Sequence, residues 1–558
     1  MKYNKADYTV SHFTTFPDYL KGIAALYGDR PALSWFTRRQ EEMALTYAQL
    51  TDRVSALRKY LLHKKLPQGT HIAVISENSA DWIISALAIM TSGHIAVCVD
   101  IEQSDSSILE MLHRSDSRIL FLSSTFLSIC RPMLTSGEAD EIILMSNHTE
   151  DPQIPTTEQL YQLGAEMDEI EHDSVTEDTI AEIVFTSGTT SLPKMVMLDH
   201  RAIMQNIYDT GTRVTLYNRV FVSLPFYHTY GFNCAVLNSF LRGTQLYING
   251  DLRTTMRDLK LANPDSTLTV PLMLEAIHNQ VWLTAERAGK DRALRLLMNV
   301  AKVFRALHIP FHPKTFLSLR ENISPSLRLI ICGGAHLSRE IAEEFELWGI
   351  QVLQGYGITE CSPLISVNCN YINKLGTVGL PLPSLEVRLD DGEVCVRGPS
   401  VMRGYYKDEE GTAEAMTEDG WFKTGDIGSM DRRGFISLSG RKKNLIVFKN
   451  GKKISPEKLE ELIFAIPMVK EVVVTGTANG IFADDVKLTA SIYPDSERTQ
   501  GMSSYEILEQ LQREIDEINR TLPAYQQIQL INIRTKEFDK TGTRKIKRHT
   551  ADTGGNYA

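Results

Sequence analysis

Apolar strand-like runs alternate with helical patterns in the N-terminal third of the chain, and this alternation most constrains the fold. Residues 71–75 form a short apolar run with the character of a buried strand. Asn78 or Ser79 can then cap a helix that Gly93 can end, and residues 95–99 form the next apolar run. Two strands joined by a helix in this way lie parallel in one sheet, and helices cover both of its faces. The sequence therefore predicts an α/β fold built on a parallel sheet.

Apolar runs of strand length recur further along the chain, at residues 118–122, 141–145, 183–185, 245–248, 327–332 and 351–353. The stretch 371–439 differs, because short strands there alternate with closely spaced turns, and it predicts a small antiparallel barrel or sheet. After Gly440, Ser455 is expected to cap a helix that has Pro456 at its first position. The remaining residues predict a separate small α+β domain, with strands near 471–474 and 486–493 and a helix near 505–520.

The length and composition limit the class of protein. A chain of 558 residues exceeds what one hydrophobic core normally supports, so at least two domains are expected. The 43% hydrophobic and 23% charged residues are typical of a soluble globular protein and argue against disorder. The net charge of −10 argues weakly against nucleic acid as the main partner. The 7 cysteines are scattered without a CxxC pair, and neither a signal peptide nor a membrane span is evident, so we expect free thiols and a cytoplasmic protein.

The strongest local signal is a buried strand that runs into a loop of hydroxyl side chains and is followed by Lys194. Successive backbone N–H groups in such a loop can form a nest for an anion, while the hydroxyls add donors and the lysine adds a positive charge. The GxxxxGK[ST] pattern is absent, which disfavours a P-loop NTPase. A Ser/Thr-rich surface loop is the alternative interpretation. The loop residues are Thr186, Ser187, Gly188, Thr189 and Thr190.

This loop is the first of four motifs that occur in a recognisable order. It is followed by Gln354-Gly-Tyr-Gly-Ile-Thr-Glu360, by Thr424-Gly-Asp426 and by Gly440-Arg441. Together they resemble the adenylate-forming (AMP-binding) enzyme superfamily, which includes acyl-CoA synthetases, luciferases of the firefly type and the adenylation domains of peptide synthetases. The resemblance covers nearly the whole chain and is greatest to fatty acyl-CoA synthetases. It implies an α/β fold with a large N-terminal domain, residues 1–440, of two α/β subdomains and a small β-barrel, and a mobile α+β C-terminal domain, residues 441–558.

The resemblance also implies roles for the residues of the second motif. Tyr356 would stack on adenine, Thr359 would bind the α-phosphate and Glu360 would bind Mg²⁺, which suits an aromatic ring and a hard carboxylate oxygen. A solvated loop acid is the alternative for Glu360. The other nucleotide-binding candidates of this motif are Gln354, Gly355 and Gly357.

Three further groups of residues match the family. Asp426 and Arg441 match the pair that holds the ribose, although the aspartate could also form only a local turn. His228 matches the histidine beside the substrate carboxylate; as a lone histidine among aromatics it could equally be a core residue. A glycine turn that would lie beside adenine and the acyl carbonyl contains Gly333, Gly334 and Ala335, although Gly-Gly can also be a simple tight turn.

A further element at residues 539–548 matches the late motif of the family and implies a moving lysine. Lys545 takes the place of the catalytic lysine that bridges carboxylate and α-phosphate oxygens in the transition state, although a basic surface tail is the alternative. Lys443 takes the place of the hinge, and Gly451 lies in the loop that would face the thiol acceptor. Departures from the family pattern occur at Ser191, Met195, Asn444 and Arg544. The catalytic candidates are Lys545, Thr186, Glu360 and His228.

The implied reaction is the ATP-dependent activation of a carboxylic acid, with Mg²⁺, to an acyl-adenylate, followed by transfer to coenzyme A. Loading of an acyl carrier protein and a catalytically inactive nucleotide-binding relative are the alternatives. A basic run from Arg292 to Arg320 contains no acidic residue and has apolar residues at helical spacing. It predicts either a helix packed on the domain or a docking face for a membrane surface or an acidic carrier protein.

Overall fold

The computed structural model describes residues 8–170, 175–186, 193–307, 309, 311, 313–448, 453–478, 486–540, 546 and 548. The chain divides into two compact units, each considered by itself. The first comprises Met1–Val387, Val396–Phe422 and Arg432–Phe435, and the second comprises Arg388–Cys395, Lys423–Asp431 and Ile436–Ala558. The small sheet of the middle region therefore belongs mainly to the second unit. The boundary at 440/441 stays a prediction.

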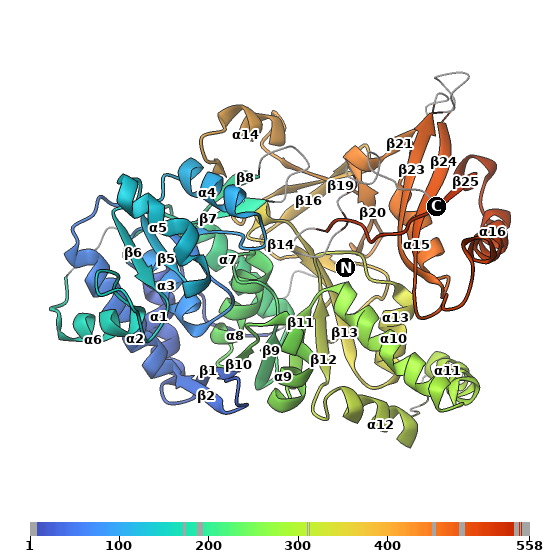
Figure 1. The fold of residues 1–558 in the computed structure, drawn as a ribbon, viewed down its shortest axis with the longest axis horizontal. Helices are drawn as coiled ribbons and strands as arrows, with labels where there is room; N and C mark the ends of the chain where they lie inside the picture. The colour runs from blue at the N-terminus through green and yellow to red at the C-terminus, as the bar shows by residue number, and fades with distance from the viewer. Residues whose placement is uncertain are drawn as a thin grey trace. The chain divides into compact units, whose positions relative to one another are not determined.

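A seven-stranded sheet forms the N-terminal half of the first unit (Figure 1). In its spatial order, the five neighbouring strands from β7 (Ile180–Thr186) to β6 (Glu141–Leu144) are parallel. The predicted βαβ unit is present, because α3 (Ala80–Thr91) joins β3 to β4 and the Ser79 side chain accepts a hydrogen bond from the Trp82 N–H. In spatial order the strands are β18 (Gly404–Tyr405), β8 (Lys194–Asp199), β7 (Ile180–Thr186), β4 (Ile95–Cys98), β3 (His71–Ile75), β5 (Ile119–Leu122) and β6 (Glu141–Leu144). The helices of this half are α1 (Phe16–Tyr27), α2 (Tyr47–His63), α4 (Asp105–Arg114), α5 (Leu127–Ser136) and α6 (Thr157–Glu166).

A nine-stranded sheet forms the other half of the first unit. In its spatial order, the strands from β13 (Gln351–Gly357) to β1 (Pro31–Phe36) are parallel. Its order is β15 (Leu380–Pro381), β14 (Leu364–Val367), β13 (Gln351–Gly357), β12 (Leu329–Cys332), β11 (Ser266–Thr269), β9 (Arg219–Val222), β10 (Gln245–Ile248), β1 (Pro31–Phe36) and β2 (Glu42–Thr46). The helices are α7 (His200–Arg213), α8 (Asn238–Leu241), α9 (Thr255–Ala262), α10 (Pro271–Arg287), α11 (Asp291–Ala306), α12 (Lys314–Ile323) and α13 (Arg339–Leu347), while α14 (Glu409–Ala415) contacts β18 of the seven-stranded sheet. Helices α10, α11 and α13 pack side by side around a core that includes Phe345 and Trp348 (Figure 1).

Within its described residues, the second unit contains three sheets. Its four-stranded sheet has the order β16 (Glu386–Asp390), β17 (Glu393–Arg397), β19 (Phe422–Met430) and β20 (Ile436–Arg441), and β21 (Ile446–Val447) pairs with β22 (Lys453–Ile454). A three-stranded sheet of β23 (Val469–Ala478), β24 (Val486–Pro494) and β25 (Leu530–Ile533) packs with α15 (Pro456–Phe464) and α16 (Ser504–Thr521). Ser455 stands at the N-cap position of α15, but the predicted side-chain cap is wrong: its hydroxyl donates to the Ser439 carbonyl and to Glu457 instead.

Three predictions about the chain as a whole can be compared with the fold. The 7 cysteines are free, and all are buried. None of the described helices combines the length and the apolar character that crossing a membrane requires. The two-subdomain α/β architecture with a smaller C-terminal unit matches the predicted fold class.

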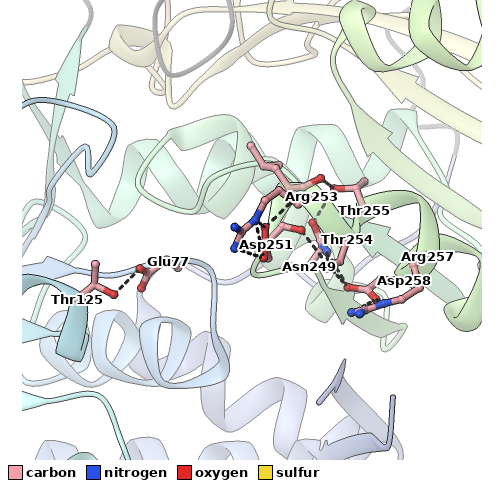
Figure 2. Close-up of polar contacts among 10 residues, drawn as sticks. Glu77, Thr125, Asn249, Asp251, Arg253, Thr254, Thr255, Arg257 and Asp258 are labelled. Atoms are coloured by element: carbon pink, nitrogen blue, oxygen red, sulfur yellow. Dashed lines mark hydrogen bonds and ion pairs between the residues drawn. The ribbon is translucent and has the colours of Figure 1, made fainter. Parts of the chain in front are cut away.

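The two large sheets of the first unit are joined where β3, β9 and β10 end. Asn78 follows β3 and donates to the carbonyls of Leu224 (2.8 Å) and Asn249 (3.3 Å), and it accepts from the Phe226 N–H (2.9 Å). Figure 2 shows that Asn249 in turn belongs to a polar network with Asp258, to which it donates at 2.9 Å. Because these groups satisfy one another, this network holds the turn after β10 and is a structural feature.

A second join lies between β7 and a π-helical segment, η2 (Tyr230–Leu237). The Asn233 amide donates to the Glu182 carboxylate at 2.7 Å, and Asn233 and Glu182 are 0% and 1% exposed. Burial raises the pKa of Glu182 to about 7, against an ordinary value of 4.5. The folded protein therefore holds a proton on Glu182 at a pH where the unfolded chain has lost it.

We expect this proton to make stability fall as pH rises. Between the two pKa values the folded state binds more protons than the unfolded state, so the free energy of unfolding decreases with pH, by up to about 3 kcal/mol at roughly 1.4 kcal/mol per pKa unit. Glu182→Gln keeps the acceptor for Asn233 and removes the titration. In urea unfolding, the stability of Glu182→Gln relative to the unmodified protein should increase from about pH 5 to about pH 8. A difference independent of pH would contradict the assignment.

Candidate active site

The structure describes most of the predicted site residues. Those that lie outside the described residues are Ser187, Gly188, Thr189, Thr190, Gly451 and Lys545. The sequence-based roles of these six stay predictions.

The two ends of the predicted phosphate loop lie opposite each other. Thr186 ends β7 and Lys194 begins β8, and these two residues are register partners in the antiparallel pairing of the strands. The segment between them therefore connects two paired strands, which the sequence analysis did not anticipate, because only the first strand was predicted. The hairpin fixes where Lys194 stands relative to the end of the central strand β7.

Tyr405 joins two of the predicted residues and was not itself predicted. The Lys194 Nζ lies over its ring, 4.2 Å from the ring centroid, and its hydroxyl donates to Glu360 Oε1 at 2.9 Å. Burial and the neighbouring Glu360 carboxylate raise the pKa of Tyr405, so it remains a hydrogen-bond donor at neutral pH. Lys194 comes from the seven-stranded sheet, while Glu360 follows β13 of the nine-stranded sheet. Tyr405 thus contacts both Lys194 on the seven-stranded sheet and Glu360, which follows a strand of the nine-stranded sheet.

Asn206 on α7 binds the backbone that directly follows Thr359 and Glu360. The Asn206 amide donates to the carbonyls of Cys361 (3.0 Å) and Leu364 (2.8 Å), and its Oδ1 accepts from the Leu364 N–H (3.3 Å). Asn206 is 1% exposed, so water cannot replace these bonds. This residue was also missed by sequence reasoning, because it lies far from the motif in the sequence.

The glycine turn lies against two other predicted motifs. A Cβ added at Gly333 would be 3.3 Å from the Gly355 carbonyl oxygen and 3.4 Å from the Tyr230 ring, and Gly334 has a φ of +85°, which favours glycine. Tyr230 donates to the carbonyls at the ends of β11 and β12 at 3.1 Å each. The turn is therefore tightly packed on one side, while Gly334 and Ala335 themselves are exposed.

The remaining residues of these motifs are mostly enclosed. Tyr356 is 6% exposed and Gln354 is also buried, with its amide donating to the Leu337 carbonyl at 3.2 Å. Gly357 leaves no room for a side chain, since an added Cβ would lie 2.2 Å from the Pro363 carbonyl oxygen. His228 is half-buried at the start of the π-helical segment, where its carbonyl accepts from the Gly231 N–H at 2.9 Å.

In the second unit, Asp426 and Arg441 face each other across β19 and β20. Arg441 Nε lies 2.8 Å from Asp426 Oδ1, and the guanidinium also donates to the Thr424 carbonyl at 3.2 Å. Asp426 is 6% exposed. Burial, and then the neighbouring Arg441, lower the pKa of Lys443. The predicted ribose and hinge residues thus form one charged group at the end of the small sheet.

The donors available for a metal ion are few. No group of three or more His, Cys, Asp or Glu side chains suited to a metal occurs in the part of the chain that the structure describes. Glu360, half-buried and oriented by Tyr405, offers a single hard carboxylate. This donor set fits Mg²⁺ carried by nucleotide phosphates, which needs one or two carboxylates, and does not form a dedicated metal cage.

The fold and these motifs define a nucleotide-binding enzyme of the adenylate-forming class. Residues 20–406 match the family model described as AMP-binding enzyme, and residues 443–553 match the AMP-binding enzyme C-terminal domain. The chain therefore belongs to the AMP-binding enzyme family, as the order of its motifs predicted. The family match, together with the names of relatives, confirms the expectation of an AMP-forming acid–thiol ligase.

Relatives with known names are similar over most of their length. A long-chain-fatty-acid–CoA ligase, FadD15, of Mycobacterium bovis is 27% identical over 458 residues, covering 78% of this chain and 75% of the relative. The chloroplastic long-chain-fatty-acid–[acyl-carrier-protein] ligase AEE15 of Arabidopsis thaliana is 27% identical over 579 residues, covering 88% and 77%. At about a quarter identity, these similarities leave the acid and the thiol acceptor open.

Solved structures share the fold over almost the whole chain. The anthranilate CoA ligase AuaEII in complex with anthranoyl-AMP superposes with a TM-score of 0.78 at 19% identity, covering 98% of both chains. The o-succinylbenzoate CoA synthetase MenE of Bacillus subtilis, in complex with its acyl-adenylate, superposes with a TM-score of 0.74 at 20% identity, covering 99% of this chain and 100% of the other. These similarities confirm the predicted fold class.

The contacts of Asn206 give a stability prediction for the Glu360 loop. Asn206→Ala leaves one buried N–H and two buried carbonyls without their partner, so we expect the free energy of unfolding to fall by about 2–4 kcal/mol. Arg201→Ala, on the same helix, removes exposed ion pairs with Glu177 and Asp178 and should cost less than about 1 kcal/mol. Urea unfolding gives both values, and hydrogen exchange should accelerate around Leu364 only in Asn206→Ala. Equal effects of the two variants would contradict this account.

Proposed function

We propose that the protein uses ATP to activate a carboxylic acid, in particular a medium- or long-chain fatty acid, and transfers the acyl group to the thiol of CoA. In the first step, a carboxylate oxygen attacks the α-phosphorus of ATP, a P–O bond forms, and pyrophosphate leaves. In the second, the thiol attacks the acyl carbonyl and AMP leaves. The observation that carries the proposal is the grouping of Lys194, Tyr405 and Glu360 across the two sheets.

In this proposal the residues of the first unit bind and orient the nucleotide. Lys194 supplies a positive charge for the phosphates, and Thr186 adds a hydroxyl at the same end of the hairpin. Mg²⁺, when bound, neutralises phosphate charge, and Glu360 would hold it. The glycine turn Gly333–Gly334–Ala335 lets the nucleotide approach the backbone, and its exposed residues support that role.

The second unit supplies the remaining proposed contacts. Asp426 and Arg441 would hold the ribose hydroxyls, and their ion pair supports a fixed position for the carboxylate. Lys545 would stabilise the charge that develops on the reacting oxygens during adenylation. The C-terminal domain would then rotate about Lys443. This rotation would withdraw Lys545 and present the face that carries Gly451 to the incoming thiol.

Two alternatives remain as outcomes of the test. The similarity to AEE15 supports a carrier-protein phosphopantetheine as the acceptor in place of CoA. A nucleotide-binding relative without catalysis is disfavoured, because Lys194, Glu360 and Asp426 are all present and in contact with oriented partners.

The decisive experiment is ATP–pyrophosphate exchange across a panel of carboxylic acids of increasing chain length, followed by thioester formation with CoA and with acyl carrier protein. We expect exchange with fatty acids and thioester formation with CoA. If exchange occurs but the thioester forms only with the carrier protein, the acceptor is the carrier protein and not CoA. No exchange with any acid would overturn the proposal.

The role of Tyr405 can be tested by removing only its hydroxyl. A hydrogen bond to a charged group is worth about 1.5–3 kcal/mol, so Tyr405→Phe should raise the Mg²⁺ concentration for half-maximal exchange about tenfold or more. Tyr406→Phe is the matched control, because the neighbouring tyrosine donates to Asp116 at 2.7 Å on the surface. Exchange rates titrated with Mg²⁺ give the comparison. If both variants behave alike, Tyr405 does not orient Glu360.

Lys545→Ala should separate the two half-reactions. Loss of a preorganised charge typically costs about 10²–10³ in rate, so exchange should fall by that factor or more. Thioester formation from added acyl-adenylate should be nearly unchanged, since the lysine acts only in the first step. The exposed Lys536, substituted by Ala, is the control. Equal loss of both half-reactions would contradict the assignment of Lys545.

A further inference from the structure

The π-helical segment η2 is fixed to the strand that leads to the predicted phosphate loop. Its Asn233 donates to Glu182 on β7 at 2.7 Å, and both residues are buried. Near its start, a Cβ added at Gly231 would lie 2.0 Å from the Pro225 carbonyl oxygen, so the backbone there is already in close contact. A buried hydrogen bond is costly to break, and closely packed groups resist displacement. The segment therefore keeps a constant position relative to β7, which ends at Thr186.

Tyr230, the first residue of η2, reaches the ends of two other strands. Its hydroxyl lies 3.1 Å from the carbonyl oxygen of Thr269, at the end of β11, and 3.1 Å from that of Ile331 in β12. A hydroxyl has one proton, so the two carbonyls share a single donor. Burial raises the pKa of Tyr230 well above its usual value of 10, so this donor keeps its proton at physiological pH. Tyr230 thus adds a link between β11 and β12 to the hydrogen bonds of the sheet.

The glycine turn begins at the point that Tyr230 holds. Gly333 directly follows β12, and its N–H donates to the same Thr269 carbonyl at 3.3 Å. A Cβ added at Gly333 would lie 3.4 Å from the Tyr230 ring, so the ring lies beside this residue. The next two residues of the turn, Gly334 and Ala335, are exposed. The turn is therefore fixed at its first residue and accessible at the two that follow.

We propose that Tyr230 is a positioning residue that sets the place of the glycine turn relative to the phosphate loop. The loop follows β7 and the turn follows β12, and these strands belong to different sheets. Packing between sheets is not directional, whereas η2 is hydrogen-bonded to β7 and, through Tyr230, to the ends of β11 and β12. The inference rests on the proposed function, in which the turn and the loop bind opposite parts of one nucleotide.

Removal of the Tyr230 hydroxyl should loosen the turn and leave the fold intact. Tyr230→Phe keeps the ring beside Gly333, and β11 and β12 keep their parallel pairing. The carbonyls of Thr269 and Ile331 lose their shared donor, so the turn gains freedom that a nucleotide must remove on binding. Ordering of this kind lowers affinity, and misplaced reacting groups lower the rate.

The test compares Tyr230→Phe with Tyr47→Phe in the full chain. Tyr47 is 0% exposed and its hydroxyl donates to the Thr244 carbonyl at 2.8 Å, so the control loses the same kind of bond outside the predicted motifs. Calorimetric titration with AMP measures affinity without an acid, and ATP–pyrophosphate exchange gives kcat and KM for ATP. Tyr230→Phe should bind AMP about fivefold more weakly or more, and its kcat/KM for ATP should fall about tenfold or more. Tyr47→Phe should match the unmodified protein in both measurements, although the urea midpoint should fall in both variants.

A purely structural role would lower the urea midpoint of Tyr230→Phe without changing its AMP affinity or its kinetic constants, and this result would overturn the inference. Equal losses of AMP affinity in both variants would overturn it as well, as would the absence of AMP binding by the unmodified protein. If the unmodified protein binds AMP but shows no exchange with any acid, only the proposed activity fails. The AMP affinities of the two variants then still decide the role of Tyr230.

Discussion

The first unit depends on buried hydrogen bonds that connect its two large sheets. Hydrophobic packing alone is not directional, so it brings two sheets together without fixing how their strand ends align. Asn78 binds the backbone beyond β9 and β10, and Asn233 binds Glu182 on β7. Each bond is costly to break because its partner would remain buried and unsatisfied. These few contacts therefore set the alignment of strand ends, and the candidate site is built on those ends.

The grouping of Lys194, Tyr405 and Glu360 follows from that alignment. Its cation stands on one sheet and its carboxylate follows a strand of the other, so a small slip between the sheets would separate them. Tyr405 bridges the two with its ring and its hydroxyl, which are separate chemical functions of one side chain. Asn206 binds the backbone of the same loop at Cys361 and Leu364. The position of Glu360 is thus fixed by the fold before any ligand binds, which is the condition for electrostatic preorganisation.

The sequence predicted the elements better than the contacts between them. The βαβ unit around Ser79 was predictable because its signals are local: an apolar run, a cap and a glycine. The motifs predicted the family for the same reason. Tyr405 and Asn206 could not be found this way, since each acts on residues far along the chain through the pairing of β18 with β8 or the packing of α7. Ser455 shows the reverse case. The local sequence strongly predicts a helix cap, but the Ser455 hydroxyl donates to the carbonyl of the distant Ser439 instead.

Net charge illustrates how an average can mislead. A total of −10 suggests that anionic partners are repelled, yet the segment from Arg292 to Arg320, which covers most of α11 and α12, carries only positive charges. Lys302 and Arg305 form ion pairs with α13, which hold α11 to the core, whereas Arg292 and Lys314 are exposed. Because salt screens interactions between exposed charges beyond about 8 Å at physiological ionic strength, a partner responds to the local charge of the surface that it meets and not to the total. A negative total therefore does not exclude an anionic partner at this segment.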